Sequence, residues 1–272
     1  QKARLNPLDG NFLLDTAPLS DTLQQEGWVN FDRINSDEAA VHLRITATEV
    51  NSGHLHVFGN SADVFPSHLE QEPLELDHII ASCSIPVVYP ATQLHDHLFW
   101  DGATVANTPL GPAIDAGAEE IIVVIMTPWD DDREVISENP SNILTSLSFT
   151  LEWALLASFQ ADLKLFRHVN ELVRLEVENA RLRATNATLM AQIQGEDVDF
   201  EDKNNNGIPD ILEKEFRQLP EPIIVGPKRP IPVERIIRYT LEGHEELYRM
   251  GYDDAKRAWR EAGKPVEGES ST

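Results

Sequence analysis

The pattern of hydrophobic and polar positions in the first part of the chain predicts short strands and helices. Residues 41–50 (VHLRITATEV) alternate between apolar and polar and are rich in β-branched side chains, which predicts a strand. The turn signal Asn-Ser-Gly at 51–53 leads into residues 54–58, so we expect a hairpin. A short helix is expected over residues 76–81.

The next segment predicts a strand, a turn, a helix and a second strand. Residues 98–100 form a short apolar run, and residues 109–116 are typical of a helix that ends at Gly117. Residues 121–126 (IIVVIM) are apolar without interruption, as in a central strand that is buried on both faces. This order is that of a βαβ unit in a layered α/β fold.

A long helix is predicted from residue 142 to about 194, with Ser141 as its N-cap. Apolar residues recur at steps of three and four between 143 and 177, so one face of the helix should pack on a sheet. The pattern thins over 181–194, which we interpret as a projecting helix or coil. Because heptad spacing is not sustained along this face, a coiled coil is not favoured.

Two further elements are predicted after an acidic, Asn-rich stretch. Residues 222–225 (PIIV) indicate a late strand, and residues 233–262 indicate a helix that is broken near Gly251.

The composition narrows the class of protein. The 272 residues are 41% hydrophobic, which is enough for a core and excludes a wholly disordered chain. The formal net charge of −24 disfavours a nucleic-acid partner, because such a surface repels phosphate. An anionic membrane would be repelled as well, unless a local patch or a bound cation intervenes.

Cysteine content and hydropathy bear on the compartment. The single cysteine, Cys83, excludes an internal disulfide and a cysteine-rich zinc site. No apolar run approaches the ~20 residues that span a bilayer, and the start has no signal-peptide pattern. We expect a cytoplasmic protein, while a periplasmic or secreted one stays open.

The sharpest chemical candidate is Asp101, which follows a predicted strand directly and precedes Gly102. Open α/β sheets place reactive groups at the carboxyl ends of strands. Gly102 permits a sharp turn or the close approach of another backbone, and Asn107 could bond across this turn. The simpler alternative is an Asx turn that only closes the strand.

Short sequence motifs surround Asp101 and also lie before and after it in the chain. They are 13–19 (LLDTAPL), 45–58, 81–86 (ASCSIP), 101–103 (DGA), 107–110 (NTPL), 117–118 (GA), 239–240 (YT) and 251–255 (GYDDA). Together these motifs resemble the C-terminal part of the patatin-like phospholipase family. The resemblance covers most of residues 11–128 and 220–260.

The resemblance implies a three-layer α/β sandwich with a mainly parallel central sheet. It also implies a serine lipid acyl hydrolase that cleaves phospholipid acyl esters with a Ser–Asp dyad and needs no metal for catalysis. Asp101 would activate the serine, with Gly102 and Ala103 forming its turn and with Asn107 and Ser82 in support. A lipid or a membrane surface would be the partner.

The family's nucleophile motif is missing from this chain. No serine lies in a G-x-S-x-G sequence, and no Gly-Gly dipeptide is present for an oxyanion loop. Since the chain also starts at Gln1, we expect the nucleophile-bearing N-terminal half of the domain to lie outside it, in the same gene product or in a separate chain. The alternative is a catalytically inactive scaffold that acts as a calcium-binding interaction module.

The expected organisation has four parts. The C-terminal half of the patatin-like core would occupy residues 1–130, and a helical segment packing on it residues 131–195. A calcium-loop insertion would occupy residues 196–219, and the final strand and helix of the core residues 220–272.

The calcium loop is expected because residues 202–213 resemble EF-hand and dockerin-like loops. Oxygen ligands fall at loop positions 1, 3, 5, 7, 9 and 12, with Gly207 at the turn position 6. These ligands are Asp202, Asn204, Asn206, the carbonyl of Ile208, Asp210 and Glu213. A structural Ca²⁺ is therefore expected, and a solvated acidic turn is the alternative.

Other reactive side chains have simpler explanations. The pairs His54/His56 and His95/His97 offer only two metal ligands each, so solvent-facing histidines are favoured over a metal site. Cys83 is interpreted as a small buried residue and not as a nucleophile. A histidine triad is not favoured, because His244 lies within the predicted terminal helix.

Overall fold

The computed structural model covers residues 1–272, and the structure is described for most of them. The described residues are 12, 14–25, 28–39, 41–60, 70–130, 139–194, 203, 218–231 and 240–266. By its internal contacts the chain divides into two compact units. The first unit contains Gln1–Ala118, Ile122–Asp162 and Ile223–Thr272, and the second contains Glu119–Ile121 and Leu163–Pro222.

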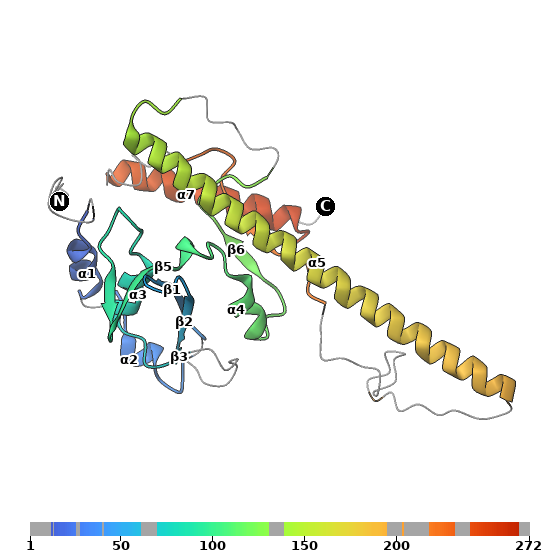
Figure 1. Ribbon diagram of the computed structural model, residues 1–272. Helices are drawn as coiled ribbons and strands as arrows, with labels where there is room; N and C mark the ends of the chain where they lie inside the picture. The colour runs from blue at the N-terminus through green and yellow to red at the C-terminus, as the bar shows by residue number, and fades with distance from the viewer. Residues whose placement is uncertain are drawn as a thin grey trace. The chain divides into compact units, whose positions relative to one another are not determined.

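The first unit contains a five-stranded sheet in the order β3-β2-β1-β5-β4 (Figure 1). Its strands are β1 (Arg44–Glu49), β2 (Leu55–Gly59), β3 (Glu70–Gln71), β4 (Thr92–Leu94) and β5 (His97–Asp101). Strand β1 pairs antiparallel with both β2 and β5, and β4 pairs antiparallel with β5. Only β2 and β3 are parallel.

The predicted hairpin is confirmed by the pairing of β1 with β2, in which Thr46 lies opposite Val57. Gly53 turns the chain with a φ of +71°, a left-handed conformation that favours glycine. The alternation read from the sequence corresponds to burial, since Ile45 and Ala47 are buried and face the core.

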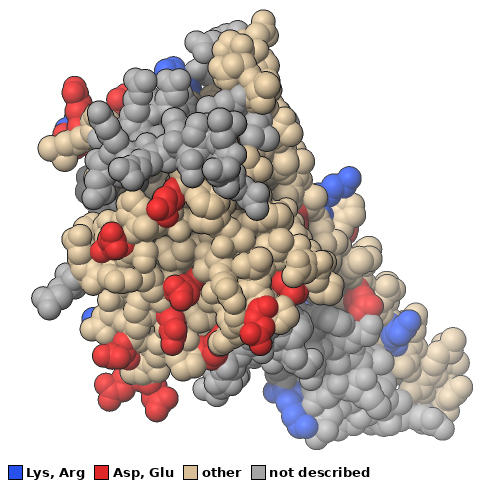
Figure 2. All heavy atoms as spheres, turned by 60° about the vertical axis from the view of Figure 1, so that its left-hand side comes forward, with Lys and Arg blue, Asp and Glu red and all other residues tan. Residues whose placement is uncertain are grey.

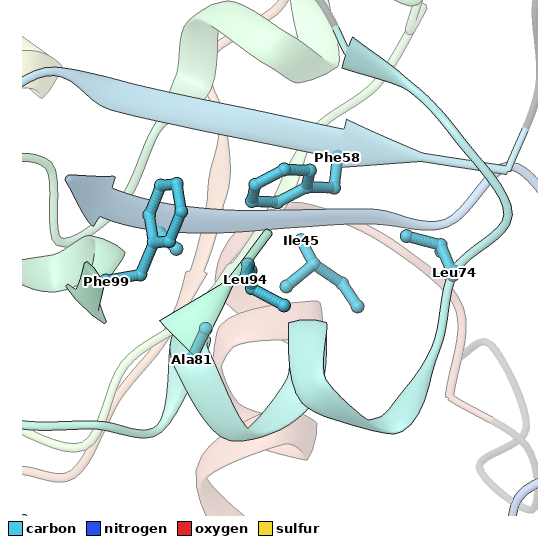
Figure 3. Close-up of a cluster of buried hydrophobic side chains, with 7 residues drawn as sticks. Ile45, Phe58, Leu74, Ala81, Leu94 and Phe99 are labelled. Carbon is cyan, nitrogen blue, oxygen red and sulfur yellow. The ribbon is translucent and has the colours of Figure 1, made fainter. Parts of the chain in front are cut away.

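Helix α3 (Leu76–Ser82), which was also predicted, covers one face of this sheet. Figure 3 shows its Ala81 directed toward side chains of the strands, among them Ile45, Phe58 and Phe99. The rings of Phe58 and Phe99 meet edge to face with centroids 5.7 Å apart, a favourable aromatic geometry. This dry core fixes β5, and therefore fixes the strand end that carries Asp101.

Helix α4 (Leu110–Asp115) and strand β6 (Ile122–Val124) follow as the pattern predicted. Gly117 ends the helix with a φ of +78°, as expected. Strand β6 pairs in parallel with β7 (Ile223–Val225), which confirms the predicted late strand. These two strands form a separate two-stranded sheet.

The burial of β6 differs from the prediction of a strand enclosed on both faces. Val123 is buried, but Ile122 is 51% and Val124 74% exposed. The apolar run is therefore covered on one face only. No described strand other than β7 pairs with β6.

The described strands also do not form the expected mainly parallel central sheet. Strands β1 and β2 are joined by a tight turn, and so are β4 and β5, and a tight turn permits only antiparallel pairing. Strands β5 and β6 lie in different sheets, so the expected βαβ unit does not pair them. The α/β character is present, since helices and strands are interspersed along the chain.

Both long helices were predicted, but the cap of the first and the expected break in the second differ from the prediction. The predicted long helix is α5 (Ile143–Gln194), whose first turn is capped by Asn142 and not by Ser141, because Asn142 Oδ1 accepts the Thr145 N–H at 2.9 Å. Helix α7 (Leu241–Glu261) continues through Gly251 without the expected break. Two short helices, α1 (Ala17–Leu23) and α2 (Phe31–Ile34), precede the sheet.

The surface reflects the acidic composition. Figure 2 shows Asp and Glu side chains gathered on one face of the described residues, with few Lys or Arg among them. None of the described helices combines the length and the apolar character needed to cross a membrane.

Candidate active site around Asp101

Asp101 is positioned by its backbone at the end of β5. Its N–H donates to the carbonyl of Ser84 at 2.9 Å, and its own carbonyl accepts the hydroxyl of Thr48 at 3.2 Å. Ser84 lies just after α3, and Thr48 lies on the neighbouring strand β1. The strand end is thus held from two directions, so the direction of its carboxylate is set by the fold.

The Asp101 carboxylate has one occupied and one open oxygen. Oδ1 accepts the N–H of Ala103 at 2.8 Å and caps the short 3-10 helix η1 (Gly102–Thr104). Oδ2 accepts no hydrogen bond from any described residue. The Asx turn that sequence offered as the simpler alternative is therefore present, and it leaves the second oxygen available.

Burial raises the pKa of Asp101, and the hydrogen bond from the Ala103 N–H offsets only part of this effect. Desolvation disfavours the charged carboxylate, so the ionised group is a stronger base than an exposed aspartate. A base of raised pKa is what proton transfer from a hydroxyl requires. The electrostatics thus suit a general base.

Gly102 is required by close packing against β1. A Cβ at this position would lie 2.7 Å from the carbonyl oxygen and 2.8 Å from the carbonyl carbon of Thr46. Any other residue would collide with backbone, which cannot move aside as a side chain can. The predicted role of this glycine, the close approach of another backbone, is confirmed.

The thiol of Cys83 interacts electrostatically with the Asp101 carboxylate. Burial raises the pKa of its thiol, and the negative charge of Asp101 raises it further. Both effects oppose formation of the thiolate, which is the nucleophilic form. This agrees with the expectation that Cys83 is not a nucleophile, although the residue is half-buried and not fully buried as expected.

The other predicted support residues lie at different places around the turn. Ala103 donates to Asp101, whereas Asn107 donates its side-chain amide to the carbonyl of Leu155 on α5 at 3.2 Å. Asn107 therefore ties the loop to a helix and does not bridge the Asp101 turn. Ser82 ends α3 and forms no hydrogen bond with Asp101.

Ser84 is the support residue that sequence reasoning missed. It is fully buried, and its hydroxyl donates to the carbonyl of Ile80 at 2.8 Å and lies 2.8 Å from the Thr92 hydroxyl. Its carbonyl accepts the Asp101 N–H. The segment 81–86 drew attention to the right loop, but spacing alone could not distinguish Ser84 from Ser82.

No described serine forms a hydrogen bond with the Asp101 carboxylate, whose described partner is Ala103. Within the described residues the site therefore contains a candidate base without a nucleophile.

Part of the chain that contains this site matches a known protein family. Residues 2–114 match the family of patatin-like phospholipases. The patatin-like region, residues 2–114, contains Asp101, Gly102 and Asn107 together with all five strands of the larger sheet. The match implies an α/β fold, suggests lipid acyl hydrolase activity and supports a hydrolase in general. A comparison with curated proteins gave no match.

Glu72 in the patatin-like region contacts two histidines, His78 and His95. Glu72 lies 2.8 Å from Nε2 of the buried His78 and 2.7 Å from Nε2 of His95. Burial tends to raise the pKa of Glu72, but the hydrogen bonds with His78 and His95 leave it below its usual value.

Glu49, the last residue of β1, also contacts two histidines. Its carboxylate lies 2.7 Å from Nδ1 of His97 and 3.6 Å from Nε2 of His56. Among the described residues no group of three His, Cys, Asp or Glu side chains is arranged to hold a metal ion. The contacts of Glu49 with His56 and His97 thus connect side chains of β1, β2 and β5.

The predicted calcium ligands, Asp202 to Glu213, lie outside the described residues. Their arrangement therefore stays a prediction from sequence.

Proposed function

We propose that this chain supplies the aspartate of a Ser–Asp dyad in a phospholipase A-type acyl hydrolase. The observation that carries the proposal is the Asp101 carboxylate, which is buried enough to be a strengthened base and keeps one oxygen without a described hydrogen-bond partner. The serine and the oxyanion donors would come from a further polypeptide segment, because the sequence contains no G-x-S-x-G elbow.

The proposed chemistry assigns one proton transfer to Asp101. As the serine Oγ forms a bond with the carbonyl carbon of the ester, the serine hydroxyl proton passes to Asp101 Oδ2. The protonated Asp101 then gives this proton to the leaving alcohol, and an acyl-serine forms. Water attacks the acyl-serine in the same way, which releases the fatty acid and restores both groups.

The exposed face of β6 supports completion of the domain by further strands. Ile122 and Val124 expose their side chains, although an uninterrupted apolar run is typical of a strand buried on both faces. Additional strands beside β6 would enlarge the β6–β7 pair into a mainly parallel central sheet, and a layer of the same further segment packed on that sheet would cover these two side chains. The cost of leaving such a face in water makes this completion favourable.

The proposed substrates are acyl esters of phospholipids at a lipid surface. The net charge of −24 opposes contact with anionic lipids. A Ca²⁺ bound by residues 202–213 would stabilise this loop and reduce the local negative charge near a membrane.

A second candidate is an inactive patatin-like scaffold that binds calcium and a partner. The absence of the elbow sequence is the observation that favours it. The two candidates differ in one outcome, since only the enzyme requires the charge of Asp101 for turnover.

Ester hydrolysis by the complete gene product that contains this chain separates the two. We expect Asp101→Asn to lower kcat for phospholipid and short-chain ester substrates by about 10²- to 10⁴-fold, the usual contribution of a general base. Asp96→Asn is the matched control, because Asp96 is exposed in the turn before β5 and should leave kcat unchanged. Equal activity of the two variants, or no activity in the unsubstituted product, would reject the proposal.

A further inference from the structure

Helix α5 has two apolar stripes in the second unit, on roughly opposite sides of the helix. One stripe is buried and includes Leu163, Phe166, Val173, Ala180 and Ala184. The other is exposed and consists of Leu165, Leu172, Leu175, Leu182, Leu189 and Ile193, which are between 41% and 79% exposed. An exposed stripe of this length on a helix indicates a surface for another molecule.

The exposed stripe has the spacing of a heptad repeat. Leu175, Leu182 and Leu189 are seven residues apart, which assigns them to position d. Position a is then occupied by Leu165, Leu172, Asn179, Asn186 and Ile193, and both asparagines are exposed as well. The repeat thus covers four heptads, with His168 as its first d residue.

This repeat is distinct from the buried stripe that dominates the hydropathy pattern. With a and d assigned as above, Val173 and Ala180 fall at b, and Ala184 falls at f. The b and f positions lie about 150° around the helix from the a/d seam. The superposition of two stripes hides the heptads in the sequence, and the exposed fractions separate them.

We propose that residues 165–193 of α5 form a parallel two-stranded coiled coil with a second copy of this chain. Leucine at d together with asparagine at a is the combination that specifies a parallel dimer. Facing asparagines can hydrogen-bond across the seam only when the two helices are parallel and in register. An asparagine that faced leucine in a shifted or antiparallel pair would be buried without a partner.

The charges beside the seam agree with a parallel pair at its centre. In a parallel dimer a g residue faces the e residue five positions later, so Glu178 meets Arg183 of the partner subunit. Glu171 would meet Glu176 of the partner subunit, a like-charge pair. Glu171 is already paired with Arg174 on its own helix at 2.6 Å, which reduces this repulsion.

The oligomeric state of the whole chain tests the proposal. Sedimentation equilibrium between about 1 and 200 μM should show a dimer that dissociates on dilution. Replacing two core leucines (Leu175→Glu with Leu182→Glu) should abolish the dimer. The matched control is Ile143→Glu, which changes an equally apolar, 88% exposed residue of α5 outside the repeat. A monomer throughout, or a dimer that survives the double substitution, would overturn the proposal.

The orientation is tested by a disulfide away from the midpoint of the repeat. In a Cys83→Ser background, Leu189→Cys should oxidise to a covalent dimer, because a parallel register places the two copies of residue 189 side by side. An antiparallel pair would place residue 189 near residue 169 instead. Failure to cross-link while the chain sediments as a dimer would therefore overturn the parallel arrangement.

Substitution of the asparagines distinguishes a specific coiled coil from non-specific hydrophobic association. Asn179→Ile with Asn186→Ile should raise the thermal stability of the dimer, because two polar residues are removed from an apolar seam, and should weaken its preference for a single register. The same dimer with unchanged stability would show that the asparagines do not face each other.

Discussion

Asp101 carries a charge in a place where a charge is costly, and this has a consequence for stability. Its pKa is raised because burial disfavours the ionised form, so the folded protein binds this proton more tightly than the unfolded chain does. At low pH, where Asp101 is protonated, the folded state does not pay the cost of placing its charge at this position. The free energy of unfolding falls as the pH rises from the usual Asp pKa to the raised pKa of Asp101, and it stays lower above that pH.

Asp101→Asn should therefore be more stable than the unsubstituted protein at neutral pH. The amide oxygen can still accept the Ala103 N–H, while the buried charge is gone. We expect a Tm higher by a few degrees at pH 7, and an advantage that shrinks as the pH falls through the raised pKa of Asp101 and disappears below the usual Asp pKa of about 4.

Thermal unfolding of both proteins across this pH range is the measurement, with Asp101→Ala as the control. The alanine also loses the turn hydrogen bond, at a cost of about 1 kcal/mol. A Tm difference between Asp101→Asn and the unsubstituted protein that is independent of pH would show that the charge carries no penalty.

Gly102 offers a second prediction at the same scale. Gly102→Ala should lower the free energy of unfolding by about 1–3 kcal/mol, because the new methyl group would lie against the Thr46 backbone. Gly111→Ala in α4 is the matched control, since nothing lies within 4 Å of a Cβ there, and it should be neutral or stabilising by about 0.5–1 kcal/mol. Urea unfolding curves that agree for the two variants would contradict the close packing.

Sequence selected the candidate base, Asp101, but not all of the groups that hold it in place. Asp101 could be selected because it follows a predicted strand and because the motifs around it together resemble those of a known family. The carbonyl of Ser84 and the hydroxyl of Thr48 could not, because they reach Asp101 from segments far away in sequence. Such contacts depend on the tertiary fold and leave no local pattern.

At the scale of elements, local signals were reliable wherever the structure is local. The β1–β2 hairpin, α3, α4 and the long helix α5 were all predicted from turn residues and periodicity. The partners of β6 were not, because a continuous apolar run predicts burial without naming the neighbour. The run is half exposed in this chain, which periodicity alone could not reveal.

The calcium loop is the element whose prediction depends on sequence alone. Ca²⁺ should raise the Tm by several degrees at saturating concentration, because a ligand that binds only the folded state stabilises it. Glu213→Gln should abolish this shift by removing the bidentate ligand, and Glu215→Gln, just beyond the loop, should not. A shift that persists in Glu213→Gln, measured against a chelator baseline, would exclude the site.

At the scale of the whole molecule, three features fit together. The patatin-like region provides a half-buried aspartate of raised pKa, β6 exposes an apolar face, and the sequence has no nucleophile elbow. A domain completed by a second segment accounts for all three. An inactive scaffold accounts for the missing elbow but gives no reason for an exposed β6 or for a carboxylate that is partly withdrawn from water.

The most direct measurement is the rate at which a fluorophosphonate labels the complete gene product, with the modified residue mapped by mass spectrometry. The reagent reacts with serines whose hydroxyl is activated by a neighbouring base. We predict one labelled serine in a G-x-S-x-G sequence beyond these 272 residues, and labelling that is slowed at least about 100-fold by Asp101→Asn. Labelling at an unchanged rate in Asp101→Asn, or no labelled serine at all, would contradict the assignment of Asp101 as the base.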